Sequence, residues 1–216
     1  VYSVYQNIDK PMVQVLIDAE LKGITVDKEQ LRRLSQFFEK KLEKLETKIF
    51  SIVGVEFNIA SPKQLGEVLF EKLNLPGGKK NKSGGFQTGA DILEDLSAKG
   101  FEIASYLLEW RKMSKLKSTY SDSLMLHINN FTGRVHTSFN LAGTSTGRLS
   151  SSDPNLQNIP IRDTEGKKIR ETFIAKEGAE LLSLDYNQIE LRLLAHIADV
   201  KGLKDAFKNN IDIHAS

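Results

Sequence analysis

The sequence predicts an α+β fold, with a mainly helical first region followed by part of an antiparallel sheet. Apolar residues recur at helical spacing through the first half of the chain. By contrast, Val135–Phe139 alternates as an edge strand after the turn at Thr132–Gly133. The short apolar run Leu181–Leu184 is typical of a buried strand. We therefore expect two regions, residues 1–130 and residues 131–216.

The first helices are marked by their ends. Asp9 followed by Pro11 predicts a helix start, and Gly23 predicts its end. A second helix is predicted to begin at Asp27, because Asp27 with Gln30 three positions later resembles a capping box. Its apolar stripe predicts packing on a neighbouring helix, and its Lys- and Glu-rich face is predicted to be solvated. The stripe consists of Leu31, Leu34, Phe38, Leu42, Leu45, Ile49 and Ile52, and it continues until Gly54, where the helix is predicted to end.

Three more helices are predicted before the sheet. Ser61–Pro62 predicts one helix start, and Thr88 with Asp91 predicts another. A long helix is predicted from about Phe101 towards His127, because apolar residues continue at helical spacing.

Two stretches of the helical region are basic. The first, from Lys72 to Ala90, has no acidic residue. It is predicted to be mobile when free and able to wrap a polyanion, although composition alone favours a solvated loop. In the second, Arg111, Lys115 and Ser118 share one helix face, which fits along a phosphate backbone. The lysines of the first stretch are Lys72, Lys79, Lys80 and Lys82.

The segment Thr144–Pro160 is rich in hydroxyl and amide side chains around one arginine, Arg148. We expect a segment of this composition to bind rather than to pack, since Gly147 allows close approach of the backbone and Arg148 supplies a forked donor. Its amides, which suit phosphates, sugars and base edges, are those of Asn155, Gln157 and Asn158. The alternative is a polar surface loop.

Asp185 ends the apolar run and precedes a helical pattern. A carboxylate at such a strand-to-helix junction suits a hard divalent cation. The alternative is that Asp185 only caps the following helix.

Three motifs resemble the family-A DNA polymerases, the bacterial DNA polymerase I family. Asp185–Arg192 resembles the first palm motif of that family, with Asn187 where the family usually has Ser. Thr144–Pro160 resembles a second family block at the expected spacing, and Lys115–Tyr120 resembles part of the thumb. The resemblance implies that residues 1–130 are a helical, DNA-binding thumb with an N-terminal palm-edge segment, and that residues 131–216 are a partial palm.

The resemblance also implies a function, which is DNA-templated transfer of a nucleotide from a dNTP to a primer 3′-OH by two-metal catalysis. It implies that Asp185 binds Mg²⁺ together with the Tyr186 carbonyl, and that Glu190 closes the space beside the sugar 2′ position. Gln188 and Arg192 would support this nucleotide site, although a structural ion pair is an equal alternative for Arg192. Arg148 would act at the primer end. The implied primer–template contacts are Arg111, Lys115, Ser118, Thr119, Arg148, Ser150, Asn155, Gln157 and Asn158.

Two-metal chemistry normally needs carboxylates from different strands, and only Asp185 is convincing here. In the family the fingers helix and the second catalytic Asp follow the position of Ser216, and His214 beside Asp212 resembles the start of the next family helix. We therefore expect this chain to be inactive without the missing C-terminal fingers and palm portion. The main alternative is a non-catalytic duplex-DNA-binding module. A two-metal nuclease using Asp185 and Glu190 is weaker, because those side chains diverge.

Composition sets limits on these readings. The net charge of +2 is too small to argue for nucleic acid without a local basic patch. There are no cysteines, which excludes disulfides and thiolate metal sites. No secretory signal or membrane span is recognisable, so we expect a cytoplasmic, nucleoid-associated protein without a membrane partner.

Overall fold

The computed structural model describes residues 1–81, 84–161, 163–209 and 211. It confirms the α+β class, with many helices and two small antiparallel sheets. Contacts divide the chain into two units, residues 1–178 and residues 179–216, which we describe separately. The thumb and palm boundaries proposed above, 1–130 and 131–216, stay a prediction.

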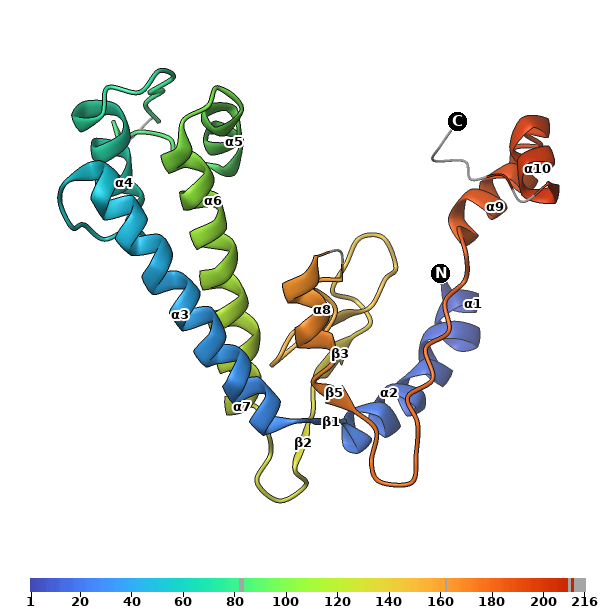
Figure 1. The fold of residues 1–216 in the computed structure, drawn as a ribbon. Coiled ribbons are helices and arrows are strands. Elements are labelled where there is room, and N and C mark those ends of the chain that lie inside the picture. The colour runs from blue at the N-terminus through green and yellow to red at the C-terminus, as the bar shows by residue number, and fades with distance from the viewer. Residues whose placement is uncertain (82–83, 162, 210, 212–216) are drawn as a thin grey trace. The chain divides into compact units, whose positions relative to one another are not determined.

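The first unit is dominated by helices (Figure 1). Helix α3 and the continuous helical stretch formed by α6, η3 and α7 pack side by side along their length. The π-helical stretches are η1, η2 and η3. The helices are α1 Tyr2–Val4, η1 Tyr5–Asp9, α2 Lys10–Lys22, α3 Lys28–Val53, α4 Pro62–Glu67, η2 Val68–Lys72, α5 Ala90–Ala98, α6 Glu102–Lys115, η3 Leu116–Asp122, α7 Ser123–Leu126 and α8 Thr164–Arg170.

The signals at the ends of α3 are confirmed. The Asp27 side chain accepts a hydrogen bond from the Gln30 amide at 2.9 Å, which satisfies one of the free amides of the first turn. Gly54 follows the last turn with φ of 77°, a left-handed conformation that favours glycine. The start of α4 is confirmed in the same way, since the Ser61 hydroxyl accepts from the Gln64 amide at 3.4 Å.

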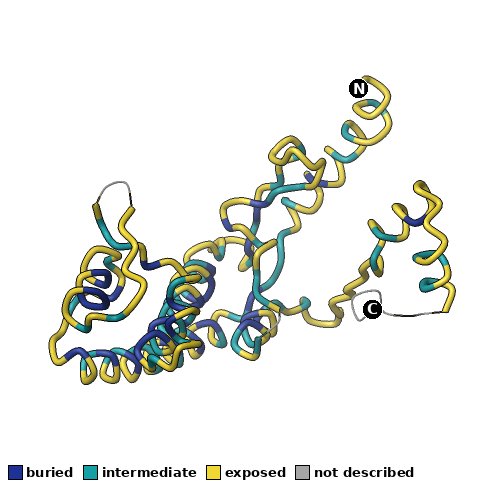
Figure 2. The backbone as a smooth tube through the Cα atoms, turned by 90° about the horizontal axis from the view of Figure 1, so that it is seen from above, coloured by how far each residue is buried: buried dark blue, intermediate teal, exposed yellow. Residues whose placement is uncertain are grey.

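Helix α3 and the stretch α6–η3–α7 together form a helical hairpin. The apolar stripe of α3 faces two hydrophobic cores, visible as dark positions along the inner side of this hairpin (Figure 2). The distal core joins the end of α3 to α4, η2, α5 and the start of α6, whereas the proximal core joins the start of α3 to η3, α7, β1, β2 and α8. Ile52 is the exception within the stripe, because it is exposed. The distal core contains Ile49, Leu65, Leu93 and Leu107, and the proximal core contains Leu31, Phe38, Leu116 and Tyr120.

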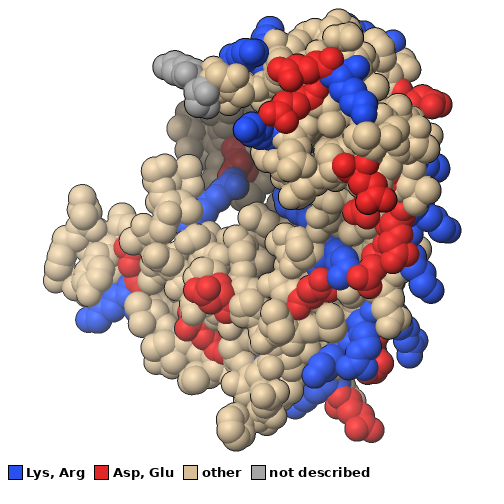
Figure 3. Space-filling model, turned by 90° about the vertical axis from the view of Figure 1, so that its left-hand side faces the viewer, with Lys and Arg blue, Asp and Glu red and all other residues tan. Residues whose placement is uncertain are grey.

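Most of the outer face of α3 is solvated, as predicted: Lys40, Glu43, Lys44 and Lys48 are exposed. The prediction is wrong for Lys41 and Glu46, which are half-buried because Lys41 donates to Glu165 and Glu46 accepts from the Trp110 indole. Figure 3 shows lysines and arginines interspersed with acids over this side of the hairpin. In that view acidic and basic side chains occur side by side over the face, so their charges partly offset one another there.

The strands form one three-stranded sheet, in the order β2-β1-β5, and one two-stranded sheet, β3-β4. All pairs are antiparallel: Ile24 faces Val135 in the first sheet, and Phe139 faces Ser151 in the second. The single edge strand predicted over 135–139 is therefore wrong, since these residues divide between two sheets. The strands are β1 Ile24–Val26, β2 Arg134–Val135, β3 Ser138–Asn140, β4 Ser150–Ser152 and β5 Phe173–Ile174.

Two predicted helix starts are also wrong. Helix α2 continues from α1 and η1 without a break, and Asp9 makes no capping bond because its own backbone is already helical. Helix α5 is preceded by Gly89, which takes the N-cap position, and Thr88 serves another partner described below. Gly23 ends α2 as predicted, with φ of 57°.

The second unit contains α9 Ile189–Ile197 and α10 Lys201–Lys208. The predicted buried strand at Leu181–Leu184 is not formed: Leu182 and Leu184 are 82% and 84% exposed. A strand needs a neighbour to pair its backbone groups, and the described residues of this unit offer none. No helix among the residues that the structure describes is long and apolar enough to cross a bilayer.

Candidate functional site

The predicted phosphate ridge lies on the exposed side of α6 and η3. Lys115, Ser118 and Thr119 are all exposed, whereas Leu116 and Tyr120 point into the proximal core. The buried residues of the helix thus anchor the ridge on the proximal core, and its polar side chains remain exposed to a partner. The Ser118 hydroxyl donates to the Ser114 carbonyl at 2.8 Å, so its oxygen remains available as an acceptor.

The polar segment Thr144–Pro160 lies against this same helix. The Tyr120 hydroxyl donates a hydrogen bond to the Asn158 carbonyl, and Leu156 and Ile159 pack against the proximal core. Burial raises the pKa of Tyr120, which keeps its hydroxyl protonated as a donor. The ridge and the segment Thr144–Pro160, which the sequence predicts independently as DNA-contacting, therefore meet in one unit of the structure.

A buried hydroxyl pair organises the segment from within. The Thr137 and Ser151 hydroxyls are 2.6 Å apart, and Thr137 also donates to the Pro154 carbonyl at 2.8 Å. Ser151 in turn accepts from the Leu156 amide at 3.0 Å. The expectation that this segment cannot pack is therefore wrong, because its hydroxyls satisfy one another and its few apolar residues are covered.

The side chains predicted to contact DNA line the open side of the segment. Arg148, Asn155, Gln157 and Asn158 are exposed, and Ser150 is half-buried in β4. The side-chain amide of Gln157 donates to the Leu149 carbonyl at 3.1 Å, and the Asn155 side-chain oxygen accepts from the backbone amide of Gln157 at 2.9 Å. The amides are thus held by the loop itself and keep further hydrogen-bonding capacity towards a ligand.

Arg111 does not stand on the open ridge. Its guanidinium donates to the Thr88 carbonyl at 2.6 Å and to the Thr88 hydroxyl at 3.5 Å. Burial lowers the pKa of Arg111, although an arginine remains charged at neutral pH. In this structure Arg111 fastens the end of the basic loop to α6, and its predicted phosphate contact stays a prediction.

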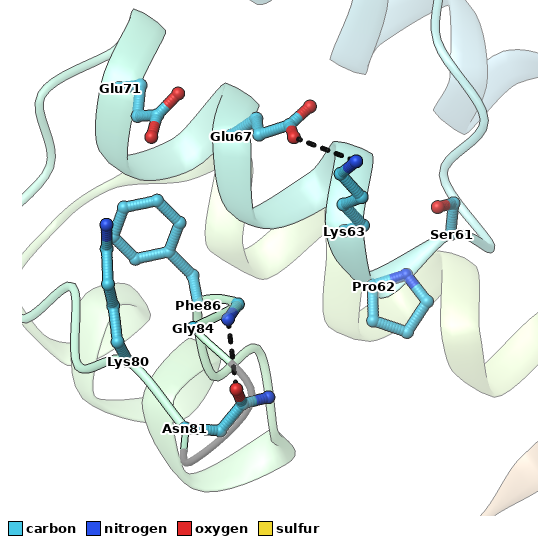
Figure 4. A pocket seen from close by; sticks show the side chains of 10 residues that line it. Ser61, Pro62, Lys63, Glu67, Glu71, Lys80, Asn81, Gly84 and Phe86 are labelled. Carbon is cyan, nitrogen blue, oxygen red and sulfur yellow. Dashed lines mark hydrogen bonds and ion pairs between the residues drawn. The ribbon is translucent and has the colours of Figure 1, made fainter.

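The described part of the basic loop is folded back on itself at a cavity of about 650 Å³ (Figure 4). The Gln87 amide donates to the Lys79 carbonyl at 2.8 Å, and the Lys80 ammonium lies 5.0 Å from the ring centre of Phe86. A Cβ at Gly66 would come within 2.7 Å of Phe86, so glycine admits this ring. Lys82 lies outside the described residues, and the mobility predicted for the loop stays a prediction.

In the second unit Asp185 is exposed, in the extended segment before α9. Gln188, with φ of 51°, takes the N-cap position, so Asp185 does not cap this helix and that alternative is wrong. Arg192 donates to the Asn187 carbonyl at 2.8 Å and lies 4.5 Å from the ring centre of Phe207. Its partners among the described residues are thus a carbonyl and a ring rather than the acid of the ion-pair alternative.

The described residues supply one part of a metal site. No group of three or more His, Cys, Asp or Glu side chains able to hold a metal ion occurs among the described residues. Asp185 nevertheless fits one share of a Mg²⁺ site, because its carboxylate is exposed and Mg²⁺ is commonly held by one or two carboxylates together with substrate phosphates. Tyr186 is exposed beside it, and Glu190 lies in the first turn of α9. Asp212 and His214 lie outside the described residues.

Comparison with known proteins identifies the family. The sequence profile of DNA polymerase family A matches residues 28–216. The chain belongs to DNA polymerase family A. DNA polymerase I of Rhizobium leguminosarum is 52% identical over 213 residues, which are 99% of this chain and 21% of that protein. DNA polymerase I of Caldicellulosiruptor bescii is 50% identical over 211 residues, which are 98% of this chain and 25% of that protein.

A solved structure of the family is similar throughout. It is the polymerase domain of Pol1 from M. smegmatis in complex with DNA primer-template and dNTP. The TM-score is 0.91 at 41% identity, and the match covers 98% of this family-A chain and 37% of that chain. The chain therefore spans about a fifth to a quarter of the two curated relatives named above, at 21% and 25%.

The main contacts that the sequence did not predict are long-range. The bond from Tyr120 to Asn158, the pair of Thr137 with Ser151, and the bonds from Arg111 to Thr88 join residues far apart in the chain. A local pattern holds no signal for such pairs beyond the presence of a polar residue on an apolar face.

Proposed function

We propose that this chain contributes primer–template binding and one metal-binding carboxylate to a DNA-templated DNA polymerase. The observation that carries the proposal is the bond between Tyr120 and Asn158, which joins the cationic ridge to the amide-rich segment. Family membership and the DNA primer-template in the similar Pol1 complex support the same partner. A DNA partner also agrees with a nucleoid-associated, cytoplasmic protein, which stays a prediction.

The ridge and the segment would divide the work of binding. Lys115 would neutralise a backbone phosphate, and the Thr119 hydroxyl would donate to a neighbouring phosphate oxygen; Ser118 would do the same only after its hydroxyl turns away from the Ser114 carbonyl. Contacts of this kind position a duplex but carry no sequence information. Arg148 and the amides of the loop would reach the sugars and the minor-groove edges of bases at the primer end. The site would therefore bind primer–template duplexes of any sequence.

The second unit would supply groups for nucleotide transfer. Asp185 and the Tyr186 carbonyl would hold Mg²⁺, which neutralises charge on phosphate oxygens when it is bound. Glu190, one turn along from this pair, would close the space beside the 2′ position of the incoming dNTP, and Gln188 and Arg192 would support the segment that holds them. A second carboxylate is needed to hold two ions, and the described residues contain no group of three or more His, Cys, Asp or Glu side chains that would supply a complete site.

Primer extension tests the proposal. The 216-residue chain would be assayed with Mg²⁺ and dNTPs, alone and fused to the C-terminal region of the Caldicellulosiruptor relative. We expect extension only from the fusion, because the second carboxylate and the triphosphate-binding residues would come from that region. Extension by the chain alone would refute the two-carboxylate argument, and no extension by a folded fusion would refute the catalytic proposal.

The second candidate function is a duplex-DNA-binding module without turnover. One observation favours it for the chain on its own: the ridge and the amide segment both belong to the first unit and need nothing from residues 179–216 to meet. Duplex binding by the chain, measured by fluorescence anisotropy in the absence of dNTP, would establish this function. Absence of binding at low salt would exclude both candidates.

A further inference from the structure

Glu165 joins three helices. Its carboxylate, in the first turn of α8, accepts a hydrogen bond from Lys41 of α3 at 2.9 Å and another from Lys112 of α6 at 3.3 Å. Lys112 also lies 3.5 Å from Asp163. The Glu165 side chain is only 18% exposed. The hydrogen bond from Lys41 is the largest cause of a pKa of about 2 for Glu165, with a smaller contribution from Lys112, so this carboxyl is ionised at neutral pH.

Helix α8 is also pressed against the end of the amide-rich segment. A Cβ at Gly166 would lie 2.5 Å from the Cβ of Pro160 and 2.9 Å from its carbonyl oxygen, so only glycine permits this approach. The Asp163 side chain accepts from the Gly166 amide at 2.7 Å and caps α8 at the same point. A shift of α8 would therefore be transmitted to Pro160 and to the loop before it.

Cations hold the other side of the contact. The ammonium groups of Lys41 and Lys168 lie 5.1 Å and 4.6 Å from the ring centre of Phe37 on α3. Helix α8 is thus attached to α3 by a lysine–aromatic contact and by the carboxylate of Glu165, and to Lys112 of α6 by Glu165 and by its N-cap residue Asp163. Its own buried residue, Ile169, adds apolar contact with the proximal core.

We infer that Glu165 is a positioning residue for DNA binding: by holding α8 to α3 and α6, it sets residues 155–158 beside the ridge that begins at Lys115. The effect on DNA rests on the proposed function, whereas the effect on the loop does not. Glu165 itself touches no substrate in this scheme. It acts through Gly166 and Pro160 on the loop that does.

Whether Glu165→Gln raises or lowers the affinity for duplex DNA distinguishes a positioning role of Glu165 from an effect of its charge alone. Glu165→Gln removes one negative charge, so electrostatics alone would tighten the binding of a polyanion. Loss of positioning would weaken it instead. Residues 155–158 contribute neutral amides rather than cations, so the salt dependence of binding would stay the same while the affinity falls.

The experiment compares four forms of the 216-residue chain. Glu165→Gln is the test, and Glu29→Gln is the matched control, because it makes the same charge change in an exposed helical pair with Arg32. Leu96→Ala, in the distal core, is the control for general loss of stability. Hydrogen exchange of residues 150–161 and duplex affinity at several salt concentrations are measured for each variant and for the unchanged chain.

We expect exchange of residues 150–161 to be about tenfold faster in Glu165→Gln and unchanged in Glu29→Gln. Duplex affinity should fall about tenfold only in Glu165→Gln, with an unaltered salt slope. Unchanged exchange in Glu165→Gln, affinity equal to or above that of Glu29→Gln, or an equal loss in Leu96→Ala would each overturn the inference. If the unchanged chain binds no duplex, the proposed function fails, and the exchange result still decides the role of Glu165.

Discussion

Helix α3 of the first unit and the segment Leu181–Leu184 of the second unit bury similar residues very differently. In the first unit Leu31 and Phe38 are fully buried, whereas Leu182 and Leu184 of the second unit are 82% and 84% exposed. A helix satisfies its own backbone hydrogen bonds and needs only an apolar surface to pack on, but a strand also needs a neighbouring strand for its amides and carbonyls. The predicted helix therefore formed where neighbouring helices of the same chain cover its apolar side, and the predicted strand did not form where the described residues of its unit offer no strand to pair with.

The units also differ in chemistry. The first presents exposed cationic and amide side chains on a packed scaffold, and the second presents an exposed carboxylate, Asp185, before a short helix. Under the proposed function, binding would reside mainly in the first unit and nucleotide transfer would depend on the second. Substitutions in each unit should thus change different measured quantities.

The largest expected effect is that of Asp185→Ala in the fused polymerase. We expect nucleotide addition to fall about a thousandfold or more, because a metal ligand contributes several kcal/mol to transition-state stabilisation. Duplex affinity should stay within about twofold, since phosphate contacts provide most of it. Asp205→Ala, which removes another exposed acid of the same unit, is the control, and retained turnover in Asp185→Ala would exclude the metal role.

A matched pair of leucine substitutions sharpens the comparison of burial. Leu31→Ala should lower the free energy of unfolding of the chain by about 2–5 kcal/mol, because it leaves a cavity in the proximal core. Leu182→Ala should change it by less than about 0.5 kcal/mol. Urea unfolding followed by circular dichroism measures both, and equal losses would show that Leu182 is packed in solution.

A smaller effect is expected at the start of α3. Asp27→Ala should cost about 1 kcal/mol, because the Gln30 amide loses its acceptor. Glu39→Ala, an exposed position in the middle of the same helix, serves as the control in the same unfolding assay. A loss no greater than that of the control would mean that the capping bond contributes nothing.

Another expected effect depends on pH. The pKa of Glu165 is lowered from 4.5 to about 2 in the folded chain, so its ion pairs stabilise the fold fully above pH 4.5. This stability should disappear as the pH falls from 4.5 towards 2, and Glu165→Gln should lack that part of the pH dependence. Unfolding curves at pH 6 and pH 3 for both forms make the comparison; parallel losses would contradict the lowered pKa.

Local signals in the sequence were enough for much of the helical hairpin. The cap at Asp27, the stop at Gly54 and the buried stripe each depend on neighbours within a few residues, and all are confirmed except for Ile52 of the stripe, which is exposed. Thr88 was wrongly predicted as a cap, because its real partner, Arg111, is 23 residues away. The bond between Glu165 and Lys41 joins residues that are 124 positions apart, so no local sequence pattern could predict it.

The candidate site divides in the same way. Residue types indicated that Lys115 and the amides of residues 155–158 suit DNA, but only the fold shows that Tyr120 brings them together. Asp185 was recognised by its motif, and its exposure in the structure agrees with a ligand role without testing it. The binding surface is therefore the part of the site for which the structure adds most to the sequence.

The salt dependence of duplex binding tests the central claim most directly. For the unchanged chain, the logarithm of the association constant should fall linearly with the logarithm of the salt concentration, and Lys115→Ala should reduce that slope by about 0.9, equally for duplexes of different sequence. Lys40→Ala, on the outer face of α3, should leave the slope unchanged. An unchanged slope for Lys115→Ala would contradict the claim that this ridge holds the duplex backbone.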